Sequence, residues 1–97
     1  MDSTVRNAIE TEVDSVLKDP ELIKKALEFS DLDSTEENMR AYMMGLLTAK
    51  FWAIYAMDVK REPTDEEFAE LMDLLSRRTK EIREVFTQYI RTSLGTQ

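Results

Sequence analysis

The fold is decided by residues 34–67, which read STEENMRAYMMGLLTAKFWAIYAMDVKREPTDEE. Ser34 is followed three residues later by Glu37, which is the spacing of a capping box at the start of a helix. Thr64 and Glu67 repeat this spacing. The apolar run between the two boxes and the amphipathic run after them each extend over many helical turns. We therefore expect two long helices, over about residues 35–60 and 65–92.

A short break containing Pro63 separates the two long helices, so we expect antiparallel neighbours, each about 40 Å long at 1.5 Å per residue. Upstream, apolar residues recur at helical spacing over about residues 3–18 and 20–30, and Pro20 separates these segments. The chain contains only two Gly and two Pro, which argues against the many turns of an all-β fold. The sequence predicts one all-α domain over residues 1–97, a small bundle of about four helices built on a long antiparallel helix hairpin.

The composition limits the chemistry that the chain can perform. It contains no Cys, which excludes disulfides and zinc sites with thiolate ligands. It also contains no His, which excludes Ser-His-Asp triads and the usual histidine metal sites. The sequence shows no nucleophile–base pair and no Gly-rich phosphate loop. We therefore predict no catalytic residues, no metal and no cofactor.

The charge indicates which partners to expect. A net charge of −7 repels phosphate backbones and argues against nucleic-acid binding. The N-terminus lacks the basic and apolar regions of a secretory signal, so we expect a cytoplasmic protein. A basic cluster near the C-terminus is interleaved with Glu81 and Glu84, whose helical spacing predicts local ion pairs. The cluster comprises Arg77, Arg78, Lys80, Arg83 and Arg91.

The helix expected over residues 35–60 raises the question of a membrane. Its span 41–59 is apolar nearly all round, and Lys50 and Asp58 are the only charges there. Such a helix is either buried in a bundle or inserted in a bilayer. Lys50 lies at its centre, where a charged side chain costs about 3 kcal/mol on membrane insertion. We therefore expect a buried bundle helix and no membrane insertion.

The same helix has two unlike faces. Small residues form one strip, which would let another helix backbone approach closely, and large apolar residues form a broader face. A chain of 97 residues offers limited surface to cover both, so we expect a homo-oligomer or a protein partner on one of them. The alternative is that the other helices of the chain cover both faces. The candidate interface residues are Gly45, Ala49, Phe51, Trp52, Ala53, Tyr55 and Arg78.

Arg78 belongs to this set because it interrupts the apolar seam of the helix over residues 65–92. A polar residue in such a seam often fixes helix register or oligomeric state. Two interpretations are open. Arg78 pairs with an acidic residue of a neighbouring helix, or it buries only its aliphatic stem while the guanidinium reaches water.

The pattern favours a non-catalytic interaction protein, acting as a homo-oligomer such as a homodimer, or as an adaptor or subunit of a protein complex. One alternative is a Mg²⁺-binding nucleotide hydrolase that uses carboxylates alone. Glutamates within residues 66–70 and 81–84 superficially resemble the acidic motifs of all-α NTP pyrophosphatases. However, about 16 Å of helix rise separates Glu70 from Glu81, which is too far for one ion site. The other alternative is an acidic inhibitor or nucleic-acid mimic, which would bind a strongly basic partner.

Overall fold

The computed structural model describes residues 1–95, and its elements follow the order predicted from the sequence. Helix α1 covers Ser3–Lys18, α2 covers Glu21–Phe29 and α3 covers Glu36–Ile54. A short π-helix, η1, continues α3 over Tyr55–Val59, and α4 covers Asp65–Gly95. The described residues form helices and no strand, so the prediction of a small all-α bundle is confirmed.

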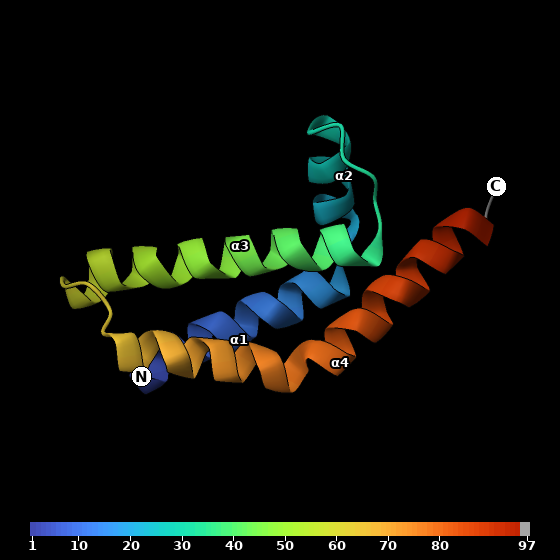
Figure 1. The fold of residues 1–97 in the computed structure, drawn as a ribbon. Helices are drawn as coiled ribbons and strands as arrows, with labels where there is room; N and C mark the ends of the chain where they lie inside the picture. Colours follow the sequence, from blue (N-terminus) through green and yellow to red (C-terminus); the bar gives the residue numbers. More distant parts are fainter. Residues whose placement is uncertain (96–97) are drawn as a thin grey trace.

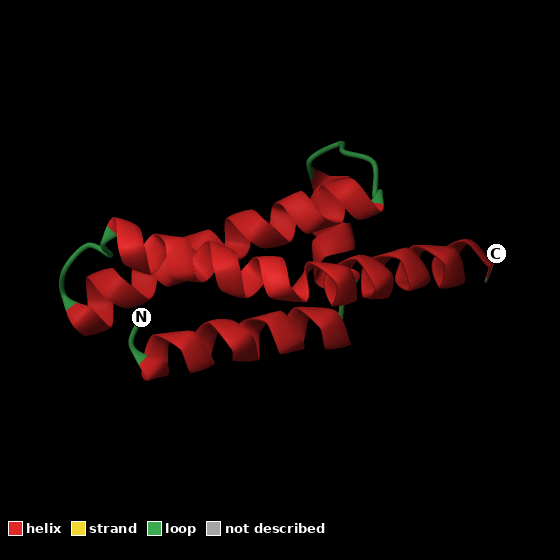
Figure 2. Cartoon of the chain, turned by 60° about the horizontal axis from the view of Figure 1, so that its bottom comes forward, coloured by secondary structure: helices red, strands yellow, loops and turns green. Residues whose placement is uncertain are grey.

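Helix α3 occupies the centre of the bundle and packs against each of the other three helices. In Figure 1, the chain runs along α3 towards the joining loop at the left and returns along α4 in the opposite direction, and α1 lies alongside both. Figure 2 shows these three helices from a second direction. Helix α4 is the longest element and reaches Gly95 rather than the predicted residue 92, so its C-terminal part extends past the other helices.

One hydrophobic core holds the bundle together, and every helix contributes buried side chains to it. Burying one large apolar side chain contributes about 1.5–3 kcal/mol relative to leaving it exposed. The buried set is therefore the main source of stability. It comprises Val5, Ile9, Val13, Ile23, Leu27, Met39, Met43, Leu47, Phe51, Tyr55, Leu71, Leu74, Leu75, Ile82 and Phe86.

Side-chain caps explain where two of the helices begin. At the start of α1, the Asp2 carboxylate accepts a hydrogen bond of 2.7 Å from the Thr4 backbone N–H. At the start of α3, the Thr35 hydroxyl accepts a hydrogen bond of 3.1 Å from the Asn38 N–H. The prediction of Ser34 as the capping residue is therefore wrong by one position, although a helix does start there.

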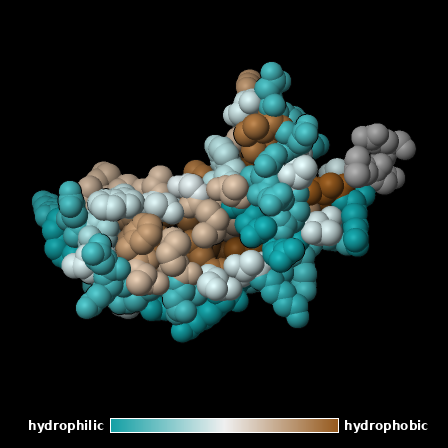
Figure 3. Space-filling model, viewed as in Figure 1, coloured by the Kyte–Doolittle hydropathy of each residue, from teal (hydrophilic) through white to brown (hydrophobic). Residues whose placement is uncertain are grey.

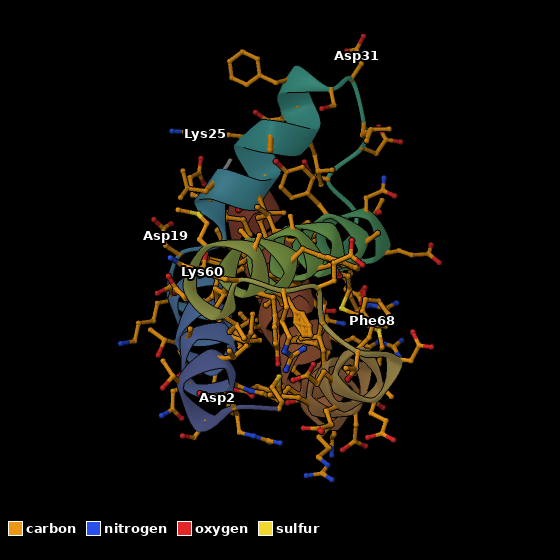
Figure 4. The ribbon with its side chains drawn as sticks, turned by 90° about the vertical axis from the view of Figure 1, so that its left-hand side faces the viewer. Asp2, Asp19, Lys25, Asp31, Lys60 and Phe68 are labelled. Atoms are coloured by element: carbon orange, nitrogen blue, oxygen red, sulfur yellow. The ribbon has the colours of Figure 1, made fainter. Side chains whose placement is uncertain are left out.

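Helix α2 differs most from its prediction. Its sequence pattern assigns Leu22 and Phe29 to the apolar side together with Ile23 and Leu27. Only Ile23 and Leu27 are buried, whereas Leu22 is 71% exposed and Phe29 is 93% exposed. Figure 4, which labels Lys25 on this helix, shows α2 projecting away from the others. A helix that meets the bundle on one side only cannot bury a broad apolar surface.

The end of α3 also departs from the continuous helix predicted over residues 35–60. The backbone widens into a π turn, in which the Lys60 N–H donates to the Tyr55 carbonyl, five residues back, at 2.7 Å. Lys60 itself has a φ of 65°, a left-handed conformation that commonly ends a helix. This turn, marked by Lys60 in Figure 4, redirects the chain towards α4.

None of the helices within residues 1–95 combines the length and the hydrophobicity that crossing a bilayer requires. Lys50, the charge near the centre of α3, forms an ion pair of 2.7 Å with Glu12 of α1. Helix α3 therefore uses its central charge to contact a neighbouring helix of the bundle.

Candidate functional site

Helix α3 turns one side into the core, and this side consists of every fourth residue. Because four residues exceed a turn of 3.6, the buried positions move round the helix by about 40° at each step. The exposed side therefore also shifts round the helix along its length, and different neighbouring helices cover the buried side at different points. The buried residues are Met39, Met43, Leu47, Phe51 and Tyr55, each with 0% exposure.

The opposite side of α3 and of η1, which continues it, is exposed, and we call it the outer face of α3. Its large side chains, Tyr42, Leu46, Trp52 and Met57, are 39%, 41%, 43% and 73% exposed. Small exposed residues lie between them, and none of the set is charged. Figure 3 shows tan and white surface along the region of α3, with teal surface at its ends. The outer face of α3 comprises Ala41, Tyr42, Gly45, Leu46, Ala49, Trp52, Ala53, Ala56 and Met57.

Gly45 lies within this face, and no contact inside the chain requires a glycine at this position. In a helix interior, Gly is less favourable than Ala by about 1 kcal/mol. A Cβ built at Gly45 meets no atom within 4 Å, so packing within the chain does not require the missing side chain. Gly45 instead leaves the backbone of α3 open to close approach from outside.

The structure divides the predicted interface residues into separate groups. Gly45, Ala49, Trp52 and Ala53 lie together on the outer face of α3. Phe51 and Tyr55, in contrast, are fully buried, with ring centroids 4.9 Å apart. Neither ring is accessible to a partner in this structure. The assignment of these two aromatic residues to an interface is therefore corrected: they belong to the core of the chain itself.

Arg78 is separate from the outer face of α3, on helix α4. Its guanidinium donates to Asp14 of α1 at 2.7 Å and to Glu81 at 3.0 Å. The hydrogen bond with Glu81, together with the weaker effect of Asp14, raises the pKa of Arg78 above its already high value. Of the two interpretations offered for Arg78, the structure shows pairing with an acidic residue of a neighbouring helix, and that helix is in the same chain.

A network around Glu67 closes the turn between α3 and α4. The Glu67 carboxylate accepts hydrogen bonds from the Tyr55 hydroxyl at 2.7 Å and from the Arg61 guanidinium at 2.8 and 3.0 Å. The capping box of Thr64 and Glu67 forms as predicted, with bonds of 2.9 and 3.1 Å. Arg61 also lies over the Tyr55 ring, 5.2 Å from its centroid. The sequence signalled only the capping box, because Tyr55 and Arg61 reach Glu67 through the geometry of the π turn.

These contacts change the acidity of two groups. The hydrogen bonds from Arg61, from the Thr64 backbone N–H and from Tyr55 hold the pKa of Glu67 well below its usual range. Burial, followed by the hydrogen bond to Glu67, raises the pKa of Tyr55 to about 12. The folded turn therefore stabilises an ionised Glu67 and a neutral Tyr55.

We expect Glu67→Gln to lower the urea midpoint at pH 7 and to flatten its dependence on pH. Because folding depresses the pKa of Glu67, its stabilising contribution is fully present above the ordinary carboxyl pKa of about 4.3 and declines progressively as the pH falls from there towards the lower pKa of the folded state. Urea titrations followed by circular dichroism at pH 7 and at about pH 3 measure this. Glu66→Gln, which changes an exposed neighbour, is the control, and equal effects of the two substitutions would contradict the assignment.

The carboxylates considered for Mg²⁺ do not converge. Among residues 1–95, no group of three or more His, Cys, Asp or Glu side chains is placed to hold a metal ion. Glu70 lies 3.7 Å from Arg6, and Asp73 forms an ion pair of 2.7 Å with Arg77. The hypothesis of a carboxylate metal site therefore gains no geometric support from this face of α4.

A second apolar surface, a shallow groove, lies where α1 and α2 meet α4, and Leu17, Pro20 and Val85 line it with Tyr89. The Tyr89 hydroxyl donates to the Glu21 carboxylate of α2. Burial, followed by this hydrogen bond, raises the pKa of Tyr89 to about 12. A hydrogen bond between two side chains of the chain itself, Tyr89 and Glu21, thus connects α4 to α2 at this groove.

Comparisons of the chain with known protein families, with curated proteins and with solved structures found no match. The interpretation of the outer face of α3 therefore depends on its geometry and chemistry.

Proposed function

We propose that this chain is a non-catalytic protein-interaction domain, which binds another polypeptide through the outer face of α3. The observation that carries the proposal is an uncharged, exposed surface about 24 Å long, at 1.5 Å per residue, on the central helix of the bundle. Single exposed apolar side chains are common on protein surfaces, whereas contiguous apolar patches mark interaction sites. The lack of Cys suits a reducing compartment such as the cytoplasm.

The composition of the outer face also supports this proposal. Tyr42 and Trp52 are partly exposed aromatic residues of the kind enriched at binding hot spots. Gly45 and Ala49 lie between them and allow a second backbone to come close. Both the homo-oligomer and the adaptor predicted from the sequence would use this combination of aromatic anchors and small residues.

Site-specific photo-cross-linking in the native host cell tests the proposal. A benzophenone amino acid in place of Tyr42 preserves an aromatic side chain on the outer face, and the same probe in place of Ser76 samples an exposed position on α4. We expect a discrete cross-linked product from position 42 and none from position 76. The product is a dimer of the chain if the protein self-associates, or a larger adduct if a different protein binds.

Two outcomes would overturn the proposed function. The first is the absence of any product from position 42 while the probe is incorporated and the protein accumulates normally. The second is an equal pattern of products from positions 42 and 76, which would show only random collisions.

A further inference from the structure

We infer that α2 carries a second binding surface, and that its partner is a basic amphipathic helix of another protein. The surface consists of the exposed side of α2 together with the turn that follows the helix, and we call it the α2 surface. It is separate from the outer face of α3, so this inference goes beyond the proposed function. The α2 surface comprises Leu22, Phe29, Asp31, Leu32 and Asp33.

The apolar part of the α2 surface consists of three large side chains. Phe29 is 93% exposed, Leu22 is 71% exposed and Leu32 is 52% exposed. Leu22 and Phe29 are seven residues apart, which is close to two helical turns, so they lie on the same side of α2. Apolar residues at this spacing are what a helix presents to a second helix.

The charged part of the α2 surface is acidic. Residues 26–39 contain five acidic residues and no basic residue. Asp31 and Asp33 are exposed, and neither belongs to an ion pair among the described residues. Figure 4 shows Asp31 at the outer end of α2, whereas the exposed Lys25 lies closer to the start of the helix. A partner that covers Phe29 therefore approaches unpaired carboxylates, which favours Lys and Arg in the partner.

Folding alone does not explain this arrangement. The C-terminal end of a helix is its negative end and favours cations, yet the last turn of α2 contains no basic residue. Asp31 has a φ of 59°, a left-handed conformation that Gly adopts more readily than Asp. The turn is closed by the Leu32 N–H, which donates to the Leu27 carbonyl at 2.9 Å. Local choices that oppose stability are expected at functional surfaces.

The acidity of the α2 surface also distinguishes between classes of partner. Helices that lie on a membrane surface carry Lys and Arg on their polar side, whereas the acidic end of α2 would be repelled by anionic lipids. It would be repelled by nucleic-acid phosphates for the same reason. A basic amphipathic helix supplies an apolar stripe for Leu22 and Phe29 as well as cations for the carboxylates of the following turn.

Binding to three synthetic helical peptides of equal length tests the inference. The first peptide has a stripe of Leu and a polar side of Lys. The second keeps Leu and replaces Lys with Gln, and the third keeps Lys and replaces Leu with Ala. Fluorescence anisotropy of each labelled peptide, titrated with the whole chain at about 150 mM salt, gives the dissociation constant. We expect the first peptide to bind at least about tenfold more tightly than either of the others, and its affinity to fall as salt is raised.

Substitutions in the α2 surface should weaken the binding of the first peptide. Phe29→Ser removes the most exposed apolar side chain, and the combination of Asp31→Asn with Asp33→Asn removes the two unpaired carboxylates. We expect each of these two variants to raise the dissociation constant at least about tenfold. Circular dichroism checks that each variant keeps its helix content.

Control variants remove similar groups elsewhere. Val59→Ser removes an exposed apolar side chain, and Glu62→Gln with Glu66→Gln removes two exposed carboxylates, so both should bind the first peptide as the unaltered chain does. An equal loss of affinity in these controls would overturn the inference, because the peptide would then bind the acidic chain without preference for α2. Absence of binding by the first peptide, or equal binding of all three peptides, would overturn it as well. None of these substitutions changes the outer face of α3, so the outcome is independent of cross-linking at Tyr42.

Discussion

Phe51→Ala is expected to lower the free energy of unfolding by about 3–5 kcal/mol, which is a large share of the stability of a small domain. Phe51 has no exposed surface, and its ring centroid lies 4.9 Å from that of Tyr55 and 6.2 Å from that of Phe68. Removing the ring forfeits its burial and leaves a cavity between helices α3 and α4, which a close-packed core refills only in part. Urea unfolding followed by circular dichroism measures the change.

The neighbouring residue provides a matched control. Trp52 is also aromatic and on the same helix, but it is 43% exposed on the outer face of α3. We expect Trp52→Ala to change the stability of the monomer by about 1 kcal/mol or less, because Ala has the highest helix propensity and part of the indole is already in water. The measurement is made at low protein concentration, so that self-association does not contribute to the measured stability.

The comparison of these two variants decides which side of α3 faces the core. If Trp52→Ala proved as destabilising as Phe51→Ala, the burial assigned to the two sides would be wrong. If Phe51→Ala cost less than about 1.5 kcal/mol, the ring would not be part of a close-packed core.

The same pair of residues shows what the sequence of α3 could and could not predict. The sequence indicated a long helix and its approximate bounds, because the capping signals and the apolar run are local. It could not indicate which side is buried, because a helix with apolar residues all round has no dominant apolar direction. Phe51 and Trp52 are equally plausible interface anchors in the sequence, and only the positions of α1, α2 and α4 distinguish them.

The sequence could not predict the long-range polar contacts, for a different reason. The capping box of Thr64 and Glu67 is local and was predicted correctly. The participation of Tyr55 requires the π turn and the left-handed Lys60, and neither has a clear signature in the sequence. The sequence left two interpretations of Arg78 open, and only the packing of α1 against α4 shows that it pairs with Asp14.

If the outer face of α3 binds a second copy of the chain, Ala49→Glu is expected to raise the dissociation constant of the dimer at least about 100-fold, which corresponds to about 2.8 kcal/mol. The substitution places a carboxylate in the middle of the outer face of α3, where burial of its charge opposes association. The monomer should be unaffected, because Ala49 is exposed and a longer side chain there can reach water. Sedimentation equilibrium over a range of concentrations gives the dissociation constants, and circular dichroism checks the fold.

Two control substitutions separate the causes. Ala49→Gln has nearly the same shape as Ala49→Glu without the charge, so it should weaken the dimer less and in proportion to size alone. Asp73→Lys changes the charge by two units on the exposed surface of α4. Among the described residues, Asp73 forms an ion pair only with Arg77. This substitution should therefore leave the dimer intact. A dimer that tolerated Ala49→Glu but dissociated with Asp73→Lys would place the interface on α4. Equal dissociation by Ala49→Gln and Ala49→Glu would instead show that close backbone contact, and not the exclusion of charge, controls the packing of α3.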